Sequence, residues 1–432
     1  MGTGISVFWF RRDLRIRDNS GLSAALRSGY ATLPIFIFDT SILSRLPDTA
    51  DRRVDYIMQA LQALQKELQG YSSDLRVYIG DPLIVWGQVL ADYDVKAVYC
   101  NTDYEPEAIE RDERIANLLQ AQGIGFNAFK DQVIFEKAEV VKQDGSPYTI
   151  FTPYSRKWKS LLSVQDYAAA ESDFDNLERL EPVVLPTLSD IGFLPTTMQY
   201  SKPVLDSRLV RDYATLRDFP VLEAGSGLGI ALRFGTLSIR EAVSFALRHS
   251  EVWLNQLIWR DFFMQILYHF PFVQRHCFKV KYENISWLND ESDFQRWCAG
   301  ETGYPLVDAG MRQLNETGFM HNRVRMLVAS FLTKHLLIDW RWGETYFAEK
   351  LNDYDLALNN GNWQWAAGCG CDAAPYFRIF NPSEQARKFD PQHEYIKRWN
   401  PTAFTRSIPP IVDHAWARDR ALKVYKSAIN QE

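Results

Sequence analysis

The sequence of 432 residues lacks several features that would assign a protein to a common class. Its five cysteines show no CxxC spacing, which argues against a disulfide framework and against a zinc site. No stretch approaches the roughly eighteen apolar residues of a membrane helix, and the N-terminus has no basic leader followed by an apolar run. We therefore expect a cytoplasmic protein that holds no metal ion and contacts no membrane.

The sequence also lacks an excess of positive charge, because its 48 lysines and arginines are outnumbered by 54 aspartates and glutamates, which gives a net charge of -6. The whole molecule therefore does not attract nucleic acid, and DNA binding would need a local basic patch. No GxGxxG motif follows the first apolar run, where Arg11, Arg12 and Asp13 stand instead. This absence argues against a pyridine-nucleotide oxidoreductase.

Aromatic residues are abundant, with 13 tryptophans and 20 tyrosines. Such a content is typical of a protein that stacks on planar ligands or moves electrons, and a large aromatic core is the alternative. The length suggests two domains.

The N-terminal part alternates short apolar runs with helix-length segments, which indicates a parallel sheet with both faces covered. The runs are Ile5–Phe10, Leu33–Phe38, Leu75–Ile79, Ala97–Cys100 and Gly125–Phe129, and the helices are Arg52–Leu68 and Glu105–Gln122. From residue 201 onward, apolar residues recur at helical spacing, as in Ile239–Arg248, Glu251–Leu267, Val307–Leu314 and Asn322–Leu337. We predict a Rossmann-like α/β domain with a five-stranded parallel sheet (1–130), a long connector (131–197) and an all-α domain (198–432).

Residues 359–382 crowd aromatic and small residues around Arg378 without helical periodicity, and we interpret them as an irregular cofactor wall. This stretch resembles the flavin-binding segment of the DNA photolyase and cryptochrome family. Further segments resemble the same family, namely FWFRRDLRIRDN (8–19), TGFMHNRVRMLVASFL (317–332) and FDPQHEYIKRW (389–399). The resemblance covers nearly the whole chain.

The resemblance implies that the all-α domain binds FAD. The expected FAD residues are Tyr213, Gly225, Ser226, Gly227, Leu228, Gly229, Arg325, Asp353, Asp355 and Asn359. The family more often has threonine and serine at Gly225 and Gly229, so phosphate binding here is expected to use backbone N–H groups, Ser226 and water. Ser238 also stands at a family position beside this segment.

The flavin ring is expected to lie over an Arg325–Asp353 pair, with Asp355 at its pyrimidine edge. Asn359 corresponds to the residue that faces flavin N5. Its neutral amide favours a reduced or neutral-radical flavin, and light receptors of the family more often have aspartate or cysteine there. Asn359 therefore favours a repair enzyme.

Three tryptophans match the path by which the family photoreduces its flavin, in the order Trp363, Trp340 and Trp287 from flavin to surface. Indoles suit this role because they are oxidised comparatively easily. Cryptochromes share this path, so it does not separate repair from light sensing.

The resemblance implies that the damaged bases are turned out of the DNA helix to reach the flavin, and Trp259 and Trp365 offer apolar planes on which these flipped bases would stack. Asn322 would bond to a pyrimidine edge, and Met326 would form an apolar wall. The (6-4) repair branch has histidine at both of these positions, so the HNRVRM pattern favours cyclobutane pyrimidine dimers as the lesion.

One position departs from this pattern. Gln256 stands where such photolyases usually have a glutamate that stabilises the anion radical of the lesion, so we expect a lower repair efficiency. Many cryptochromes and (6-4) enzymes also have glutamine there. Arg217, Arg323 and Arg378 match positions that hold the phosphates around the lesion. Residues that either widen this patch or form a solvated basic face are Arg260, Arg387, Lys388, Lys397 and Arg398.

We predict a light-driven, FAD-dependent deoxyribodipyrimidine photo-lyase that acts on UV-damaged DNA as a monomer. The alternatives are a cryptochrome-type photoreceptor and a (6-4) photolyase. Receptors commonly carry long C-terminal extensions that this sequence lacks, which weakens the first alternative. The sequence leaves open whether the N-terminal domain holds an antenna chromophore, a folate or a deazaflavin. Glu105 falls where some relatives contact a folate, and an exposed carboxylate at a helix start is the alternative.

Overall fold

The computed structural model describes residues 4–222, 225–406 and 408–430. The chain divides into two compact units, and neither is continuous in sequence. Unit 1 comprises Met1–Glu136, Leu161–Leu205 and Leu228–Arg248, and unit 2 comprises Lys137–Ser160, Asp206–Gly227 and His249–Glu432. The predicted connector therefore contributes to both units. The predicted domain bounds themselves stay a prediction.

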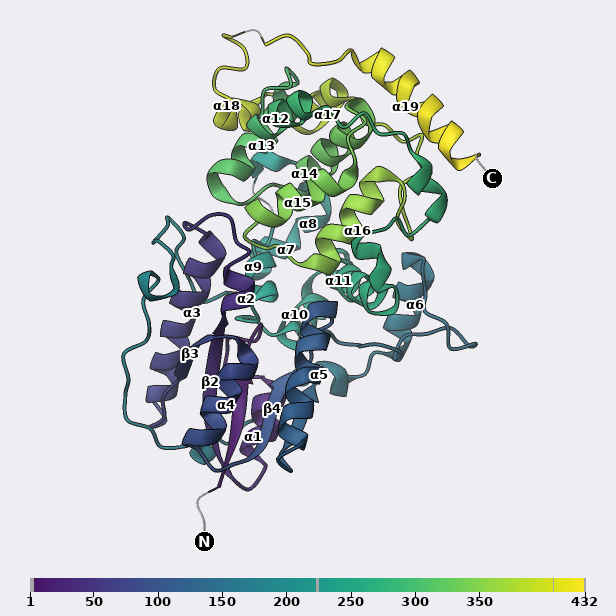
Figure 1. The fold of residues 1–432 in the computed structure, drawn as a ribbon. Coiled ribbons are helices and arrows are strands. Elements are labelled where there is room, and N and C mark those ends of the chain that lie inside the picture. Colours follow the sequence, from purple (N-terminus) through teal and green to yellow (C-terminus); the bar gives the residue numbers. More distant parts are fainter. Residues whose placement is uncertain (1–3, 223–224, 407, 431–432) are drawn as a thin grey trace. The chain divides into compact units, whose positions relative to one another are not determined.

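Unit 1 contains a parallel five-stranded sheet with the strand order β3-β2-β1-β4-β5 (Figure 1). The strands are β1 (Ile5–Phe10), β2 (Ala31–Asp39), β3 (Arg76–Gly80), β4 (Val95–Asn101) and β5 (Gly125–Phe129). This confirms the predicted sheet. The chain leaves β1 toward β2 and β3 and then returns to β4 on the other side, so the strand order reverses between β1 and β4.

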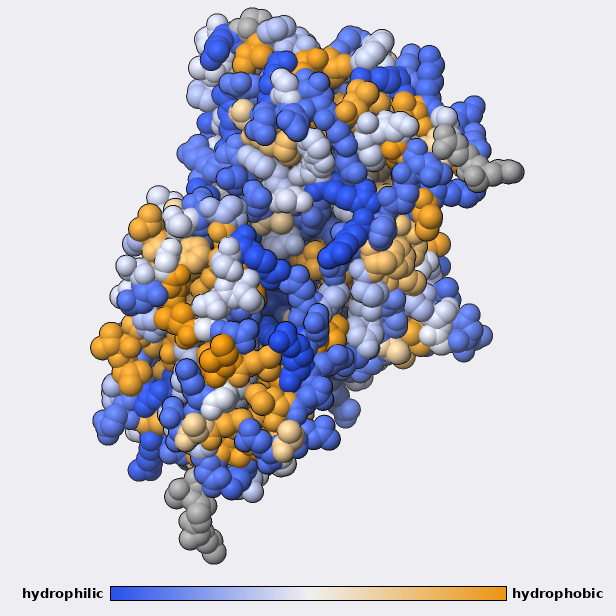
Figure 2. All heavy atoms as spheres, in the orientation of Figure 1, coloured by the Kyte–Doolittle hydropathy of each residue, from blue (hydrophilic) through white to orange (hydrophobic). Residues whose placement is uncertain are grey.

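Helices cover both faces of this sheet, because successive side chains of a strand point to opposite sides. Phe8 and Phe10 belong to the core with α1 and α3, whereas Val7 and Trp9 belong to the core with α4 and α5. The helices of unit 1 are α1 (Ser20–Leu26), α2 (Thr40–Leu43), α3 (Arg52–Gln69), α4 (Pro82–Asp92), α5 (Pro106–Gln120), α9 (Gly229–Arg233) and α10 (Ile239–His249). Figure 2 shows apolar side chains on the visible surface around β3 and α4, where Ile79 and Ile84 are exposed.

Unit 2 is helical, and its largest core joins α13 to α16. Its helices are α6 (Phe151–Leu161), α7 (Ser207–Arg211), α8 (Tyr213–Leu216), α11 (Glu251–His269), α12 (Glu291–Ala299), α13 (Pro305–Thr317), α14 (Asn322–Ser330), α15 (Trp340–Lys350), α16 (Leu356–Ala367), α17 (Pro382–Phe389), α18 (Glu394–Trp399) and α19 (His414–Ile429). The predicted helix at 322–337 is α14 followed by a π-helical turn, η7 (Phe331–His335). Within the described ranges, no helix has the length and apolar character needed to cross a bilayer.

The structure corrects the interpretation of residues 359–382 as irregular throughout. Residues 356–367 form the regular helix α16, which Gly368 ends with a φ of 95°. Much of α16 is buried, with aromatic and small residues distributed around it. It therefore shows no amphipathic stripe by which sequence periodicity could reveal a helix. Only the segment between α16 and α17 is irregular.

Candidate active site

Helix α16 presents the expected flavin-facing and lesion-facing residues from one rigid element of unit 2. Asn359 and Trp363 are one turn apart on α16 and both are buried, whereas Trp365 is partly buried. Asp355 is the N-cap, and its carboxylate accepts a hydrogen bond from the Leu358 backbone N–H at 3.2 Å. Asp355 thus fixes the start of the helix, and its expected contact with the flavin stays a proposal.

Arg325 of α14 and Asp353, just before α16, form the expected pair. Arg325 donates to Oδ2 of Asp353 at 3.0 Å and to the Met320 backbone oxygen at 2.7 Å. Oδ1 of Asp353 is buried and has no partner in the described part of the chain. A buried acceptor without a donor is costly, so this oxygen suits a ligand that brings an N–H or O–H group. The pair thus fits a flavin ring.

Asn359 is held by a residue that the sequence did not single out, Glu344 of α15. The Asn359 Nδ2 donates to both the Glu344 backbone oxygen at 2.9 Å and its Oε1 at 2.8 Å. A backbone oxygen only accepts, so the amide nitrogen must face it and Oδ1 points elsewhere. Burial raises the pKa of Glu344 to about 7, although the Asn359 bond opposes the shift. The four-residue spacing from buried Trp340 could have placed Glu344 on the inner face of α15.

The three tryptophans lie along connected segments of unit 2. A Cβ atom at Gly343 would overlap the Trp363 indole, so Trp363 packs on α15 about one turn from Trp340. Leu288 donates its backbone N–H to the Leu337 oxygen at 2.7 Å, which brings the Trp287 segment beside the residues before Trp340. Trp363 and Trp340 are 2% and 1% exposed, and Trp287 is only partly buried. Of the three, only Trp287, the residue expected at the surface end, is partly exposed.

The expected lesion-facing residues come from three helices, α11, α14 and α16, of which α11 and α14 both pack against α16. Trp259 of α11 is partly exposed. Asn322 and Met326 lie side by side on α14, with 4.0 Å between Nδ2 and Sδ. Gln256 of α11 makes one long bond, from Nε2 to the Val252 backbone oxygen at 3.4 Å. Its amide is thus only weakly held.

The segment expected to bind the FAD phosphates, residues 225–229, is divided between the two units. Gly225, Ser226 and Gly227 belong to unit 2, whereas Leu228 and Gly229 belong to unit 1. Residues 223 and 224 lie outside the described residues. Within unit 2, Gly227 has a φ of 66°, which favours glycine. Nearby in sequence, Tyr213 of α8 lies 5.9 Å beneath the Arg217 guanidinium.

The four expected DNA contacts differ in exposure. Arg378 is exposed in the segment after α16, and Arg323 is half-buried, paired with Asp218 at 2.6 Å. Arg260 is only 6% exposed, so the structure does not support it as a surface phosphate contact. The basic residues of α17 and α18 are exposed, namely Arg387, Lys388, Lys397 and Arg398.

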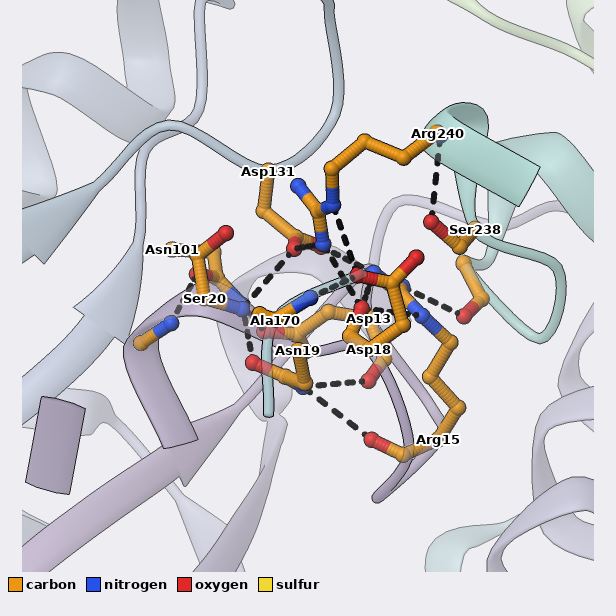
Figure 3. A network of polar contacts seen from close by, with 12 residues as sticks. Asp13, Arg15, Asp18, Asn19, Ser20, Asn101, Asp131, Ala170, Ser238 and Arg240 are labelled. Atoms are coloured by element: carbon orange, nitrogen blue, oxygen red, sulfur yellow. Dashed lines mark hydrogen bonds and ion pairs between the residues drawn. The ribbon is translucent and has the colours of Figure 1, made fainter. Parts of the chain in front are cut away.

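In unit 1, the carboxyl ends of β1 and β4 are occupied by polar side chains bonded to one another (Figure 3). Asn101 donates to Asp13 at 2.5 Å and to Asn19 at 2.8 Å. Burial raises the pKa of Asp13 to about 6, against the lowering effect of its hydrogen bonds. Glu105, predicted as a folate contact or an exposed carboxylate, is bonded to Arg12 and Arg233, each at 2.7 Å, and its side chain is not exposed.

Comparisons with known proteins place these features in one family. A family model described as the FAD binding domain of DNA photolyase matches residues 253–407, and one described as DNA photolyase matches residues 6–173. A helical FAD-binding domain preceded by a parallel α/β domain defines a class of two-domain flavoproteins. The chain is 39% identical to the deoxyribodipyrimidine photo-lyase of Synechococcus sp. strain PCC 6301, over 91% of this chain and 87% of that protein. The chain belongs to the DNA photolyase and cryptochrome family.

Solved structures agree with this assignment. A bacterial class III photolyase from Agrobacterium tumefaciens matches with a TM-score of 0.87 and 32% identity, covering 100% of this chain and 99% of that one. An archaeal photolyase from Sulfolobus tokodaii with two FAD molecules matches with a TM-score of 0.81 and 34% identity, covering 98% and 99%. A Synechocystis sp. PCC6803 cryptochrome matches with a TM-score of 0.83 and 25% identity, covering 98% and 100%.

Proposed function

We propose that this chain is a deoxyribodipyrimidine photo-lyase that repairs cyclobutane pyrimidine dimers in DNA with blue light. The observation that carries the proposal is the pairing of Asn322 and Met326 on α14, with 4.0 Å between them, in place of two histidines of the (6-4) branch. Full-length relatives of this name support it. Bound FAD, when reduced and excited, supplies the electron that splits the cyclobutane ring and takes it back afterwards.

The chain's own residues hold the flavin in the form that this reaction needs. Oδ1 of Asp353 accepts a hydrogen bond from the flavin, and Arg325 keeps the aspartate in place. Because Glu344 uses both hydrogens of the Asn359 amide, Oδ1 of Asn359 is the atom that accepts from N5–H. This arrangement favours a protonated N5. Trp363, Trp340 and Trp287 would conduct electrons inward to the photoexcited flavin, and a soluble reductant at the surface would return Trp287 to its reduced state.

On the lesion side, Trp259 and Trp365 stack on the flipped bases, and the amide of Asn322 bonds to a pyrimidine edge. The Gln256 N–H group donates to a carbonyl oxygen that gains charge when the lesion receives the electron. Arg217, Arg323 and Arg378 hold the neighbouring phosphates, and the exposed cations of α17 and α18 extend this contact. The protein acts as a monomer.

Illumination of a dimer-containing oligonucleotide with the reduced holoprotein tests this function, with restored thymine absorbance as the measurement. We expect restoration that depends on light and on flavin. If flavin photoreduction is intact but no thymine is restored, the chain is a photoreceptor instead. Gln256 is the observation that favours this second candidate.

Replacement of Gln256 by glutamate tests the contact directly. We expect Gln256→Glu to raise the repair yield severalfold, because a protonated carboxyl donates a stronger hydrogen bond than an amide to an oxygen that gains negative charge. The measurement is thymines restored per absorbed photon. An unchanged or lower yield would show that Gln256 does not face the lesion.

We further propose that unit 1 binds a second chromophore that is a flavin or deazaflavin rather than a folate. Two arginines already occupy the Glu105 carboxylate, which weakens the case for a folate at this residue. The two FAD molecules of the Sulfolobus tokodaii photolyase show that a family member can hold a second flavin. The absorption spectrum of the isolated protein, followed by extraction of its chromophores, tests this proposal. A pterin band would contradict it.

A further inference from the structure

Helix α6 comes from the predicted connector, yet its residues up to Ser160 belong to unit 2, where α6 contacts α11 through side chains. Three of its side chains recur at helical spacing and meet α11 in turn. Trp158 donates from Nε1 to Oδ2 of Asp261 at 3.0 Å, and the rings of Tyr154 and Phe262 lie 5.2 Å apart. The first residue of α6, Phe151, meets Trp259. The helix is therefore fixed against the element that carries the lesion-facing tryptophan.

The contact of Phe151 with Trp259 is a flat stack. The ring centroids are 3.7 Å apart, and the planes differ by only 4°. Phe263, the other ring stacked on Trp259, lies farther away at 5.4 Å and is inclined by 30°. Phe151 therefore covers one face of the indole and restricts its rotation. Trp259 is nevertheless partly exposed, so part of its indole stays accessible to a flipped base.

The backbone of Phe151 is fixed as well. Its N–H group donates to Oδ2 of Asp372 at 3.0 Å, and a carboxylate is favoured at the first turn of a helix. Asp372 lies in the irregular segment after α16. Two residues later, Ala374 donates its backbone N–H to the Trp365 oxygen at 3.3 Å. Phe151 thus contacts Trp259 through its ring and is tied to the Trp365 segment through its backbone.

We propose that Phe151 is a positioning residue that fixes the plane of Trp259 and, through Asp372, its separation from the segment after Trp365. This inference rests on the proposed function, because the two tryptophans are taken to clamp the flipped lesion. A pre-organised clamp does not lose side-chain freedom when the lesion enters, so it binds more tightly than a mobile one. Phe151 itself does not touch the lesion.

The test compares Phe151→Leu, Phe151→Tyr and wild-type holoprotein. The measurements are the Kd for a dimer-containing single strand, the Kd for the undamaged strand, the repair yield and the flavin content. We expect Phe151→Leu to weaken dimer binding about tenfold, since a stacked aromatic pair is lost. Binding of the undamaged strand and flavin content should not change, and Phe151→Tyr should restore dimer binding. Phe272→Leu, at an exposed phenylalanine of the same unit, is the matched control.

Dimer binding by Phe151→Leu that equals or exceeds wild type would overturn the proposal, and tighter binding would mean that Phe151 occupies the place of the base. If Phe151→Leu loses flavin, the Asp372→Ala variant tests the proposal instead. It removes the acceptor of the Phe151 backbone N–H group and leaves the aromatic side chains unchanged. We expect it to weaken dimer binding about threefold, and unchanged binding overturns the proposal. Wild-type protein that shows no preference for dimers overturns the proposed function and this inference together. If wild-type protein prefers dimers but the variant binds dimers as tightly as wild type does, the inference about Phe151 is overturned and the proposed function is not.

Discussion

Asp131 of unit 1 and Asp353 of unit 2 both pair with arginine, but they differ in whether the second carboxylate oxygen accepts a hydrogen bond. Arg15 donates to Oδ2 of Asp131, and Arg240 and the Ser20 backbone N–H donate to Oδ1 (Figure 3). Asp353 receives Arg325 on Oδ2, whereas its buried Oδ1 has no partner within the described residues.

This difference separates a structural network from the site that we propose for the flavin. A buried carboxylate whose donors are all present stabilises the fold, and one with an unused oxygen is destabilised until a donor arrives. Asp131 is 1% exposed in side chain, and Asp353 is 22% exposed. Unit 1 therefore uses its arginines to join loops, whereas unit 2 leaves an acceptor for a ligand.

The largest expected effect concerns Asp131, whose two carboxylate oxygens both have hydrogen-bond donors. We expect Asp131→Ala to lower the free energy of unfolding of unit 1 by about 3–5 kcal/mol, because Arg15 and Arg240 would keep buried charges without their partner. Urea unfolding followed by circular dichroism measures this change. The matched control is Asp94→Ala, which breaks a surface pair with Lys96 and should change stability by less than about 0.5 kcal/mol. Equal effects of the two variants would contradict the comparison.

Replacement of Asp353, which pairs with Arg325, should change FAD affinity rather than stability. We expect Asp353→Asn to weaken FAD binding by about tenfold to a hundredfold, because the flavin loses a charged acceptor, with little loss of stability. FAD titration followed by flavin fluorescence measures the affinity, and urea unfolding measures stability. The control is Asp419→Asn in the exposed Arg418–Asp419 pair, which should leave FAD affinity unchanged. A variant that unfolds readily but binds FAD normally would make Asp353 a structural residue like Asp131.

Sequence periodicity predicted the elements that bury one face or alternate regularly. The strands from β1 to β5 begin within two residues of the predicted runs, and α10 and α11 begin at the predicted residues. It missed α16, because a helix buried on most sides shows no apolar stripe. It also missed the π-helical turn after Ser330, in which Lys334 and His335 are buried.

The candidate site shows the same limit. The family resemblance gave the Arg325–Asp353 pair, and the structure contains this ion pair. Glu344 and Phe151 act through residues distant in sequence, Asn359 and Trp259, and only the fold brings them together. Arg260 illustrates the opposite error, because a charge that looks suited to phosphate in the sequence is buried in the structure.

The smallest expected effect concerns pH and sharpens the comparison of carboxylates. Burial alone would raise the pKa of Asp131, but Arg15 and Arg240 bring it below its usual value, whereas the pKa of Glu344 is raised to about 7. Folding therefore favours the ionised form of Asp131 and the protonated form of Glu344. The stability that Asp131 contributes is lost as pH falls, and the stability that the Glu344 proton contributes is lost as pH rises from about 4.5 to 7.

Glu344→Gln keeps an acceptor for Asn359 but removes the titration. We expect wild-type protein to lose about 1–2 kcal/mol more of its free energy of unfolding than Glu344→Gln between pH 5 and pH 6.5. Asp13, whose pKa is also raised, contributes equally to both proteins and cancels in the difference. Urea unfolding at several pH values measures this effect. Parallel pH profiles would show that Glu344 is ionised in the fold, and the Asn359 amide would then be held by a charge rather than by a neutral carboxyl.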